Sequence, residues 1–173
     1  MKKVIFIILI QFSGCTAPKS AYQAEDFTCY PKAVYLFRHA EKQVIKGEDN
    51  PELTKAGFVR SNALAEAMTD ISAGLIYSSE YARTQQTAAP LAKQWSTDIN
   101  IKTAKDPEAQ VDIALANCNQ HVIIVGHSNT IPNLISLFGV VEEITIEDNQ
   151  YGDLFIIEWV DARPQLRIEQ VGK

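Results

Sequence analysis

The fold is indicated most clearly by a short apolar run that ends in polar residues, HVIIVGHSN at positions 121–129. A second run, AVYLFRH at positions 33–39, has the same form and ends in an arginine and a histidine. Unbroken apolar runs of this length are typical of strands that are buried on both faces of a parallel sheet. Both runs are therefore predicted to be central strands, with their polar residues at the carboxyl ends.

The rest of the chain alternates between strand and helix patterns. Further strands are expected at 75–79, 99–103, 153–160 and 166–171, with a turn at Arg163 and Pro164 before the last one. Helical spacing is found after Thr54, around Ala88, after Pro107 and around Pro132. Strands separated by helices predict an α/β protein, here a three-layer α/β/α sandwich with a mainly parallel sheet.

Length, composition and charge limit the classes of protein that this chain can be. Its 173 residues are 46% hydrophobic and 21% charged, which fits one globular domain and excludes a disordered or fibrous chain. The net charge of -5 and the lack of a lysine-rich or arginine-rich block argue against a nucleic-acid partner. Three histidines are too few for a multi-histidine metal cage, so neither a metal nor another cofactor is expected.

The start of the chain has the layout of an export signal. Lysines at positions 2 and 3 precede an apolar run at 4–10 that is too short to cross a bilayer. The tetrapeptide FSGC at 12–15 resembles the lipobox of bacterial lipoproteins, in which Cys15 would be lipidated.

This interpretation divides the chain into a signal peptide at 1–14, a tether at 15–30 and a folded domain at 31–173. Lipidation implies export and a membrane partner through an N-terminal lipid anchor. Thr16 follows the cysteine, which by resemblance to Gram-negative sorting rules favours the periplasmic face of the outer membrane.

Polar clusters follow three of the predicted strands. They are Arg38-His39, the segment from Ser79 to Arg83, and Gly126-His127. Because ligands bind beyond the carboxyl ends of parallel strands, these clusters are expected to converge on one site. Two arginines and two histidines suit a small, doubly charged anion, since the guanidinium fork matches the oxygens of a phosphate.

Four ordered blocks of sequence resemble the histidine phosphatase (phosphoglycerate mutase-like) superfamily. They are RHAEK at 38–42, LTKAG at 53–57, SSEYARTQQTA at 78–88 and GHSN at 126–129. The resemblance covers about residues 33–160. It implies the phosphoglycerate mutase-like fold and the hydrolysis of a phosphate monoester, in a small phosphorylated substrate, through a phosphohistidine.

The same resemblance assigns roles to four residues. His39 matches the nucleophile that attacks phosphorus. Arg38, Arg83 and His127 match the pocket that binds the phosphoryl oxygens and the charge that develops on them. Nearby arginines should also lower the pKa of His39 and keep its imidazole neutral.

The acid that would protonate the leaving group stays open at this point. Many members carry a recognisable glutamate after the second arginine, and the segment at 102–108 has no clean match to it. Asp106 is favoured because its position before Pro107 holds it in an extended segment. Glu108 is the alternative, and a purely capping role for Asp106 is equally compatible with the sequence.

The resemblance also bears on the cysteines. If Cys15 is acylated, Cys29 and Cys118 remain, either as two unrelated thiols or as a disulfide formed in an oxidising compartment. In the family the two strands that carry the histidines are parallel neighbours. Both cysteines would then lie at the opposite edge of the sheet from the site, which favours a Cys29–Cys118 bond.

Three other functions are compatible with these residues. A phosphohistidine-protein phosphatase would use the same site, and so would a phosphoglycerate-type mutase. A mutase needs a cover over its intermediate, and the stretch between Arg83 and His127 is short for one. A non-catalytic phosphoryl-binding module would need only the arginines. The sequence indicates no oligomeric state.

Overall fold

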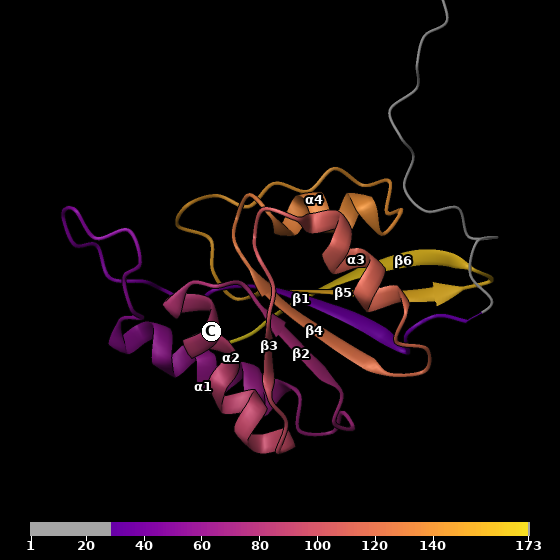
Figure 1. Ribbon diagram of the computed structural model, residues 1–173, viewed down its shortest axis with the longest axis horizontal. Helices are drawn as coiled ribbons and strands as arrows, with labels where there is room; N and C mark the ends of the chain where they lie inside the picture. The colour runs from indigo at the N-terminus through magenta and orange to yellow at the C-terminus, as the bar shows by residue number, and fades with distance from the viewer. Residues whose placement is uncertain (1–28, 173) are drawn as a thin grey trace, which may run out of the picture.

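The computed structural model describes residues 29–172 (Figure 1). The predicted signal peptide, the lipobox with Cys15 and most of the predicted tether lie outside these residues. The described strands are β1 (Ala33–Arg38), β2 (Leu75–Ser78), β3 (Ile99–Ile101), β4 (His121–Gly126), β5 (Asp153–Val160) and β6 (Arg163–Gln170). The described helices are α1 (Lys55–Ala67), α2 (Ala82–Trp95), α3 (Pro107–Leu115) and α4 (Ile131–Leu137).

The described strands form one six-stranded sheet in the order β3-β2-β4-β1-β5-β6. The four strands from β3 to β1 are parallel, while β5 runs antiparallel to β1 and β6 antiparallel to β5. The two histidine-bearing strands β1 and β4 are neighbours, and Arg38 pairs with Gly126 at their carboxyl ends. The prediction of a mainly parallel sheet is therefore confirmed.

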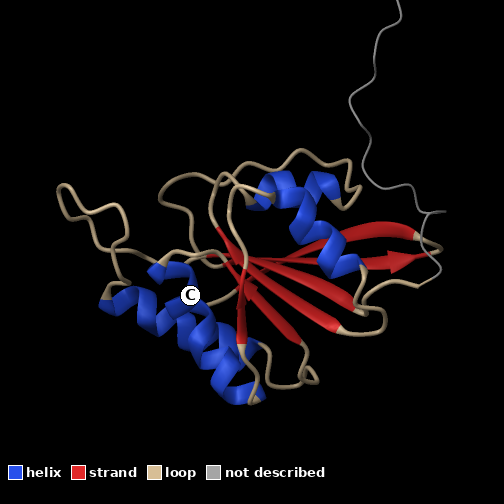
Figure 2. Ribbon diagram, viewed as in Figure 1, coloured by secondary structure: helices blue, strands red, loops and turns tan. Residues whose placement is uncertain are grey.

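Helices cover both faces of the sheet, α1 and α2 on one side and α3 and α4 on the other (Figure 2). Alternate residues of β1 show why two layers form. Tyr35 and Phe37 pack in the core beneath α1 and α2, whereas Val34 and Leu36 pack beneath α3 and α4. The three-layer sandwich is confirmed. No helix within residues 29–172 is long and apolar enough to cross a membrane.

Local sequence explains where α1 begins and how close it lies to the site. Thr54 caps α1, and its side chain accepts a hydrogen bond from the Gly57 amide. A Cβ atom at Gly57 would lie 2.3 Å from the carbonyl oxygen of Glu41. Only glycine permits that approach, so this position packs α1 directly against the loop that follows His39.

Two predicted boundaries are wrong. The hairpin between β5 and β6 turns at Asp161 and Ala162, with φ angles of 50° and 60°, instead of at Arg163 and Pro164. Such turns usually carry Asn or Gly, and this sequence has neither, which hid the turn. Pro164 is tolerated inside β6 because β6 is an edge strand. β3 also ends at Ile101, two residues earlier than expected.

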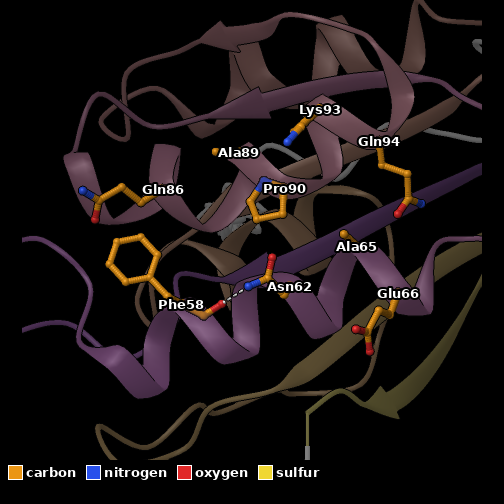
Figure 3. A pocket seen from close by; sticks show the side chains of 9 residues that line it. All are labelled: Phe58, Asn62, Ala65, Glu66, Gln86, Ala89, Pro90, Lys93 and Gln94. Atoms are coloured by element: carbon orange, nitrogen blue, oxygen red, sulfur yellow. Dashed lines mark hydrogen bonds between the residues drawn. The ribbon is translucent and has the colours of Figure 1, made fainter.

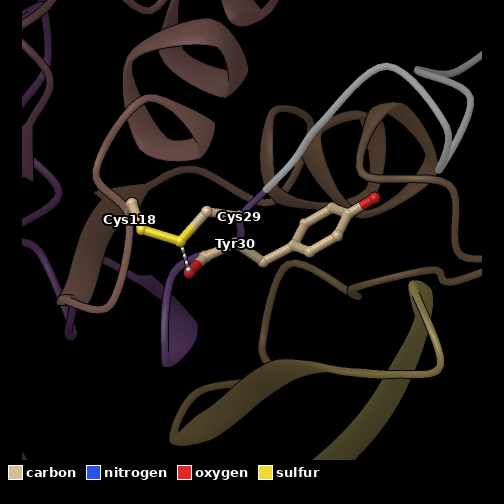
Figure 4. The surroundings of a disulfide bond; sticks show 3 residues. All are labelled: Cys29, Tyr30 and Cys118. Atoms are coloured by element: carbon tan, nitrogen blue, oxygen red, sulfur yellow. Dashed lines mark hydrogen bonds between the residues drawn. A yellow bond between two sulfur atoms is a disulfide. The ribbon is translucent and has the colours of Figure 1, made fainter.

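A disulfide joins Cys29 to Cys118, with 5.5 Å between their Cα atoms (Figure 4). Cys29 precedes β1 and Cys118 precedes β4, so the bond lies at the edge of the sheet where both strands begin. Arg38 and Gly126 lie at the opposite edge. The disulfide therefore ties the start of the domain to the sheet without touching the polar clusters.

Removing this disulfide is expected to lower stability while sparing the site. The bond spans 89 residues, and closing a loop of that length stabilises a folded protein by about 4 kcal/mol. The Cys29→Ser/Cys118→Ser double variant should therefore unfold at a lower urea concentration than the oxidised wild type and at the same concentration as the reduced wild type. Identical midpoints for oxidised wild type and variant, or two free thiols titrated in unreduced exported protein, would contradict this.

Candidate active site

His39 lies directly after β1 and is fixed in one orientation. Its backbone amide donates to the carbonyl of Gly126, extending the pairing of β1 with β4 at 2.9 Å. The ring is buried, and Nδ1 lies 2.8 Å from the carbonyl oxygen of Ala40. Because a carbonyl only accepts, Nδ1 carries the hydrogen. The lone pair of His39 is therefore on Nε2, the atom that a nucleophilic histidine would use.

His127 follows β4, and its ring centre lies 5.2 Å from that of His39. Its Nε2 is 2.9 Å from Oγ of Ser79, which is 2.8 Å from Oγ1 of Thr84. Thr84 donates its hydroxyl hydrogen to the carbonyl of Tyr81 at 2.7 Å. Ser79 must then donate to Thr84 and accept from Nε2–H of His127. These two hydroxyls hold the His127 ring and determine its tautomer.

Both histidines are neutral at neutral pH. Burial, together with the positive charges of His127, Arg83 and Arg38, lowers the pKa of His39 to about 3, although the bond to Ala40 opposes the shift. Burial and the charge of Arg83 lower the pKa of His127 to about 4, against a smaller opposing effect of Glu80. A neutral imidazole keeps a lone pair. The lowered pKa of His39 agrees with the prediction, with burial as its largest cause and the arginines as smaller ones.

Arg38 is held by main-chain oxygens and an aromatic ring. Its Nη1 donates to the carbonyls of Glu147 and Gln150, both at 2.7 Å, and Nη2 donates to that of Asp148 at 3.1 Å. The guanidinium carbon also lies 4.3 Å from the ring centre of Tyr151. Nε is buried without a hydrogen-bond partner.

Arg83 lies in the first turn of α2 and is held more loosely. Its guanidinium carbon is 4.3 Å from the ring centre of Tyr81, and Nη1 is 3.5 Å from the carbonyl oxygen of Asp49. Its Nε, like that of Arg38, is buried and unpartnered. Two buried cationic donors without acceptors are costly unless an anion completes them. This arrangement fits the predicted phosphate site.

A hollow of about 270 Å³ lies beside this group. Its lining consists of Tyr81, Arg83, Ala104, Lys105, His127, Asn129 and Thr130. No carboxylic acid is among these lining residues. The hollow therefore presents cationic and neutral donors to whatever is attached to a phosphoryl group in the site.

A separate groove of about 680 Å³ lies between α1 and α2 (Figure 3). Phe58 and Pro90 face it from the two helices, and Glu66 and Lys93 are its charged residues. No histidine or arginine lines this groove. We therefore do not assign the chemistry to it.

The structure gives the carboxylates near the site other partners. Asp106 is exposed and caps α3, where its side chain accepts from the Ala109 amide at 3.0 Å, and it does not line the hollow. Glu108 is an exposed residue of the first turn of α3. The capping role anticipated for Asp106 is therefore the one that the structure supplies.

Glu80 and Glu41 also have partners for their carboxylates. Burial acts to raise the pKa of Glu80, but hydrogen bonds from backbone amides, including that of Ala104, outweigh it and lower the pKa. Burial likewise opposes the lowered pKa of Glu41, which results from its hydrogen bonds and ion pair with Arg60 at 2.7 Å. Both carboxylates are ionised at neutral pH and are poor proton donors.

Among residues 29–172, no group of three or more His, Cys, Asp or Glu could hold a metal.

The structure thus brings together Arg38, His39, Arg83 and His127, as expected, and leaves Asp106 aside. The sequence interpretation missed the two tyrosines under the arginines and the carbonyls that hold Arg38. Every residue has a backbone carbonyl, so residue types do not show which carbonyls would accept hydrogen bonds from Arg38.

Acid is expected to destabilise the protein through its two buried histidines. Unfolded histidines titrate near pH 6.5, whereas the folded pKa values are about 3 and about 4. Below pH 6.5 the unfolded state therefore binds more protons, and the free energy of unfolding falls as the pH drops toward 4. At pH 5 each histidine should cost about 2 kcal/mol of stability. Urea denaturation at pH 7 and pH 5 in phosphate-free buffer measures this loss.

The His39→Gln variant is the comparison for that measurement. It should lose clearly less stability between pH 7 and pH 5 than the wild type, because His39 is gone while His127 and the partly buried His121, whose pKa is also lowered, remain. The interval lies above the range in which carboxylates titrate. Equal losses in the two proteins would contradict the assignment of the effect to the histidines.

Comparison with known proteins agrees with this geometry. Residues 34–106 match the family model described as "Histidine phosphatase superfamily (branch 1)". A phosphoserine phosphatase from Entamoeba histolytica, solved with 3-phosphoglyceric acid, superposes with a TM-score of 0.62 at 16% identity, covering 82% of this chain and 97% of that one. Comparison with curated proteins gives no match.

Two other solved structures are similar. A candidate phosphohistidine phosphatase, SixA from Agrobacterium tumefaciens, has a TM-score of 0.58 at 22% identity and covers 82% of this chain and 98% of that one. A mycobacterial glucosyl-3-phosphoglycerate phosphatase has a TM-score of 0.61 at 13% identity and covers 80% and 97%. At these identities the likeness establishes the fold. The family model covers residues 34–106, and together with the four ordered sequence blocks it indicates that this chain is similar to the histidine phosphatase superfamily.

Proposed function

We propose that this protein hydrolyses a phosphate monoester through a phosphohistidine formed on Nε2 of His39. The observation that carries the proposal is a neutral, buried His39 whose Nδ1–H is bound by Ala40, beside two arginine Nε groups that lack acceptors. Nε2 would attack phosphorus, forming an N–P bond while the P–O bond to the leaving group breaks. Water would then attack phosphorus, releasing orthophosphate and restoring the His39 lone pair.

Arg38 and Arg83 would stabilise the charge on the phosphoryl oxygens during both steps. Each guanidinium rests against a tyrosine ring, so little reorganisation is needed when the charge develops. His127 lies beside His39 and would form one wall of the pocket around the phosphoryl group. The leaving group would extend into the hollow near Lys105 and Asn129.

The substrate class proposed is a small phosphorylated metabolite of the cell envelope. The similar structures include enzymes named for phosphoserine and glucosyl-3-phosphoglycerate, which are both small phosphate esters. The hollow of about 270 Å³ suits a leaving group of that size.

A second candidate, a phosphohistidine-protein phosphatase, is favoured by one observation. No carboxylic acid lines the hollow, and the ionised Glu80 is a poor proton donor. A phosphorylated imidazole can be protonated before it leaves and so does not need an enzymatic acid. An alkoxide leaving group does need one, which is typically worth about 10²–10⁴-fold in rate.

A single labelling experiment separates the functional classes. Purified protein is incubated with p-nitrophenyl phosphate, and product release is measured together with acid-labile phosphate on the chain. Turnover with phosphorylated His39 supports the phosphatase, and transfer of the label between acceptors supports a mutase. Binding without labelling or turnover would identify a phosphoryl-binding module and overturn the proposal.

The leaving group is tested with esters that differ in the basicity of the alcohol released, together with a phosphohistidine peptide. Asp106→Asn is included because asparagine also caps helices well. An equal, small loss on all esters would leave Asp106 as a cap. A severe loss confined to poor leaving groups, with p-nitrophenyl phosphate spared, would make it the acid. A strong preference for the peptide supports the second candidate.

We further propose that the protein is exported and lipid-anchored, on the periplasmic face of the outer membrane. The FSGC motif at 12–15 supports lipidation, and the Cys29–Cys118 disulfide supports an oxidising compartment. Labelling cells with radioactive palmitate should mark the full chain and not its Cys15→Ser variant. Fractionation of the envelope then tells outer from inner membrane. Unlabelled wild-type protein would overturn the anchor.

A further inference from the structure

We propose that Asp153 is a positioning residue of the phosphate site, acting on Arg38 through Gln150. This inference rests on the proposed function, because it concerns how one of the phosphate-binding arginines is held. Asp153 is the first residue of β5, and its carboxyl side chain is buried. A buried carboxylate has to be compensated by hydrogen bonds or charges. Its partners lead directly to the site.

The first step is the cage around Arg38. Three backbone carbonyls of one turn accept hydrogen bonds from the two terminal nitrogens of the guanidinium. They belong to Glu147, Asp148 and Gln150. Of the five N–H groups of the guanidinium, Nε–H and one hydrogen on Nη2 are left for a phosphoryl oxygen, and Nε is buried without any other partner. The direction of Nε is therefore set by the position of this turn, which belongs to no helix or strand.

The second step is what holds the turn. The amide of Gln150 donates to the carbonyl of Glu147 at 2.9 Å. The side chain of Gln150 closes the turn again, because its Oε1 accepts from the backbone amide of Glu147 at 3.1 Å. For that contact the Gln150 amide group must keep its oxygen toward Glu147 and its nitrogen away from it.

The third step is the carboxylate. Oδ2 of Asp153 accepts from Nε2 of Gln150, and Oδ1 accepts from Nε2 of Gln170, the residue that pairs with Asp153 across β5 and β6. Asp153 thus fixes which way the Gln150 amide faces. Because β5 pairs with β1 just behind Arg38, the carboxylate ties the turn to the same sheet that carries the arginine.

Asparagine at position 153 tests this chain of contacts with almost no change in size. Two glutamine nitrogens need two acceptors, and an asparagine offers one oxygen and one NH₂ group. If the side-chain amide of Gln150 rotates to place its oxygen toward the NH₂ group of this asparagine, its nitrogen faces the backbone amide of Glu147. Two donors then face each other, and the hydrogen bond between them is lost. The turn should loosen, and Nε of Arg38 should lose its fixed direction.

We expect Asp153→Asn to lower kcat/KM for p-nitrophenyl phosphate about tenfold and to weaken orthophosphate binding, measured by calorimetry, by a similar factor. In an Arg38→Ala background the same change should have less than about a twofold effect, since the arginine that it positions is gone. Gln150→Leu, which leaves the Asp153–Gln170 contact in place, should reproduce the tenfold loss and provides a second route if Asp153→Asn folds poorly.

Asp161→Asn is the matched control, the same change at the opposite end of the β5–β6 hairpin, where asparagine suits the positive φ of 50°. It should leave activity and phosphate binding unchanged. The proposal would be overturned if Asp153→Asn lowered kcat/KM by the same factor in the wild type and in the Arg38→Ala background. It would also be overturned if neither Asp153→Asn nor Gln150→Leu lowered kcat/KM. If the wild type neither turns over nor binds orthophosphate, the proposed function fails instead.

Discussion

Replacing His39 with alanine is expected to abolish phosphoenzyme formation and to reduce turnover by a factor on the order of 10⁴ or more. The change removes Nε2, the nitrogen whose lone pair is left free when Nδ1–H is bound by the Ala40 carbonyl. The measurement is hydrolysis of p-nitrophenyl phosphate alongside detection of acid-labile phosphate on the chain. Full activity in His39→Ala would overturn the whole assignment of this site.

His121→Ala is the matched control for that experiment. His121 begins β4 at the edge of the sheet opposite the site, where its Nδ1 lies 3.3 Å from the hydroxyl of Tyr35. Its removal should leave labelling and turnover close to wild type. Urea denaturation of both variants shows whether any loss reflects unfolding instead of lost chemistry.

Removing either of the arginines proposed to bind phosphate, Arg38 or Arg83, should lower kcat by about hundredfold or more. Arg38→Ala and Arg83→Ala each delete a guanidinium whose buried Nε has no acceptor within the protein. Lysine at either position should restore little, because it has a single ammonium and no planar fork. Steady-state kinetics and orthophosphate binding measure both effects.

The two arginine variants should differ in stability. Each variant loses the contact of its guanidinium with a tyrosine ring. Arg38→Ala also leaves three carbonyls without their guanidinium donors, whereas Arg83→Ala breaks one long hydrogen bond to the Asp49 carbonyl. Arg38→Ala should therefore also lower the free energy of unfolding, by about 1–3 kcal/mol. The exposed Arg167, on β6, is the control and should tolerate alanine in both assays. Equal stability of the two variants would contradict the difference inferred for their surroundings.

Much of the fold could be predicted because its signals are local. An apolar run such as 121–125 can be buried only where both faces of a strand are covered, so it indicates a central strand by itself. Thr54 and Pro107 mark helix starts through their own hydrogen-bonding and φ preferences, and both begin helices here. The β5–β6 turn was misplaced because Asp161 and Ala162 adopt positive φ without the glycine that usually reports it.

The candidate site was predictable only in part. Arg38, His39, Arg83 and His127 follow strand ends or begin a helix, and parallel strands bring such positions together. Asp106 was favoured for its place before a proline, yet its carboxylate caps α3. An aspartate that caps a helix and an aspartate that donates a proton look identical in a sequence. Only the groups that surround the side chain in the folded protein distinguish the two roles.

The sequence by itself determined the order of strands and helices, the four side chains that can surround a phosphoryl group, and the pair of cysteines. Each of these depends on residue type and spacing along the chain. Only the tertiary structure decided that His39 presents Nε2, that Ser79 and Thr84 orient His127, and that backbone carbonyls bind both terminal nitrogens of Arg38 while its Nε has no partner. Those features depend on the directions of hydrogen bonds between segments far apart in sequence, and a direction exists only once the chain has folded.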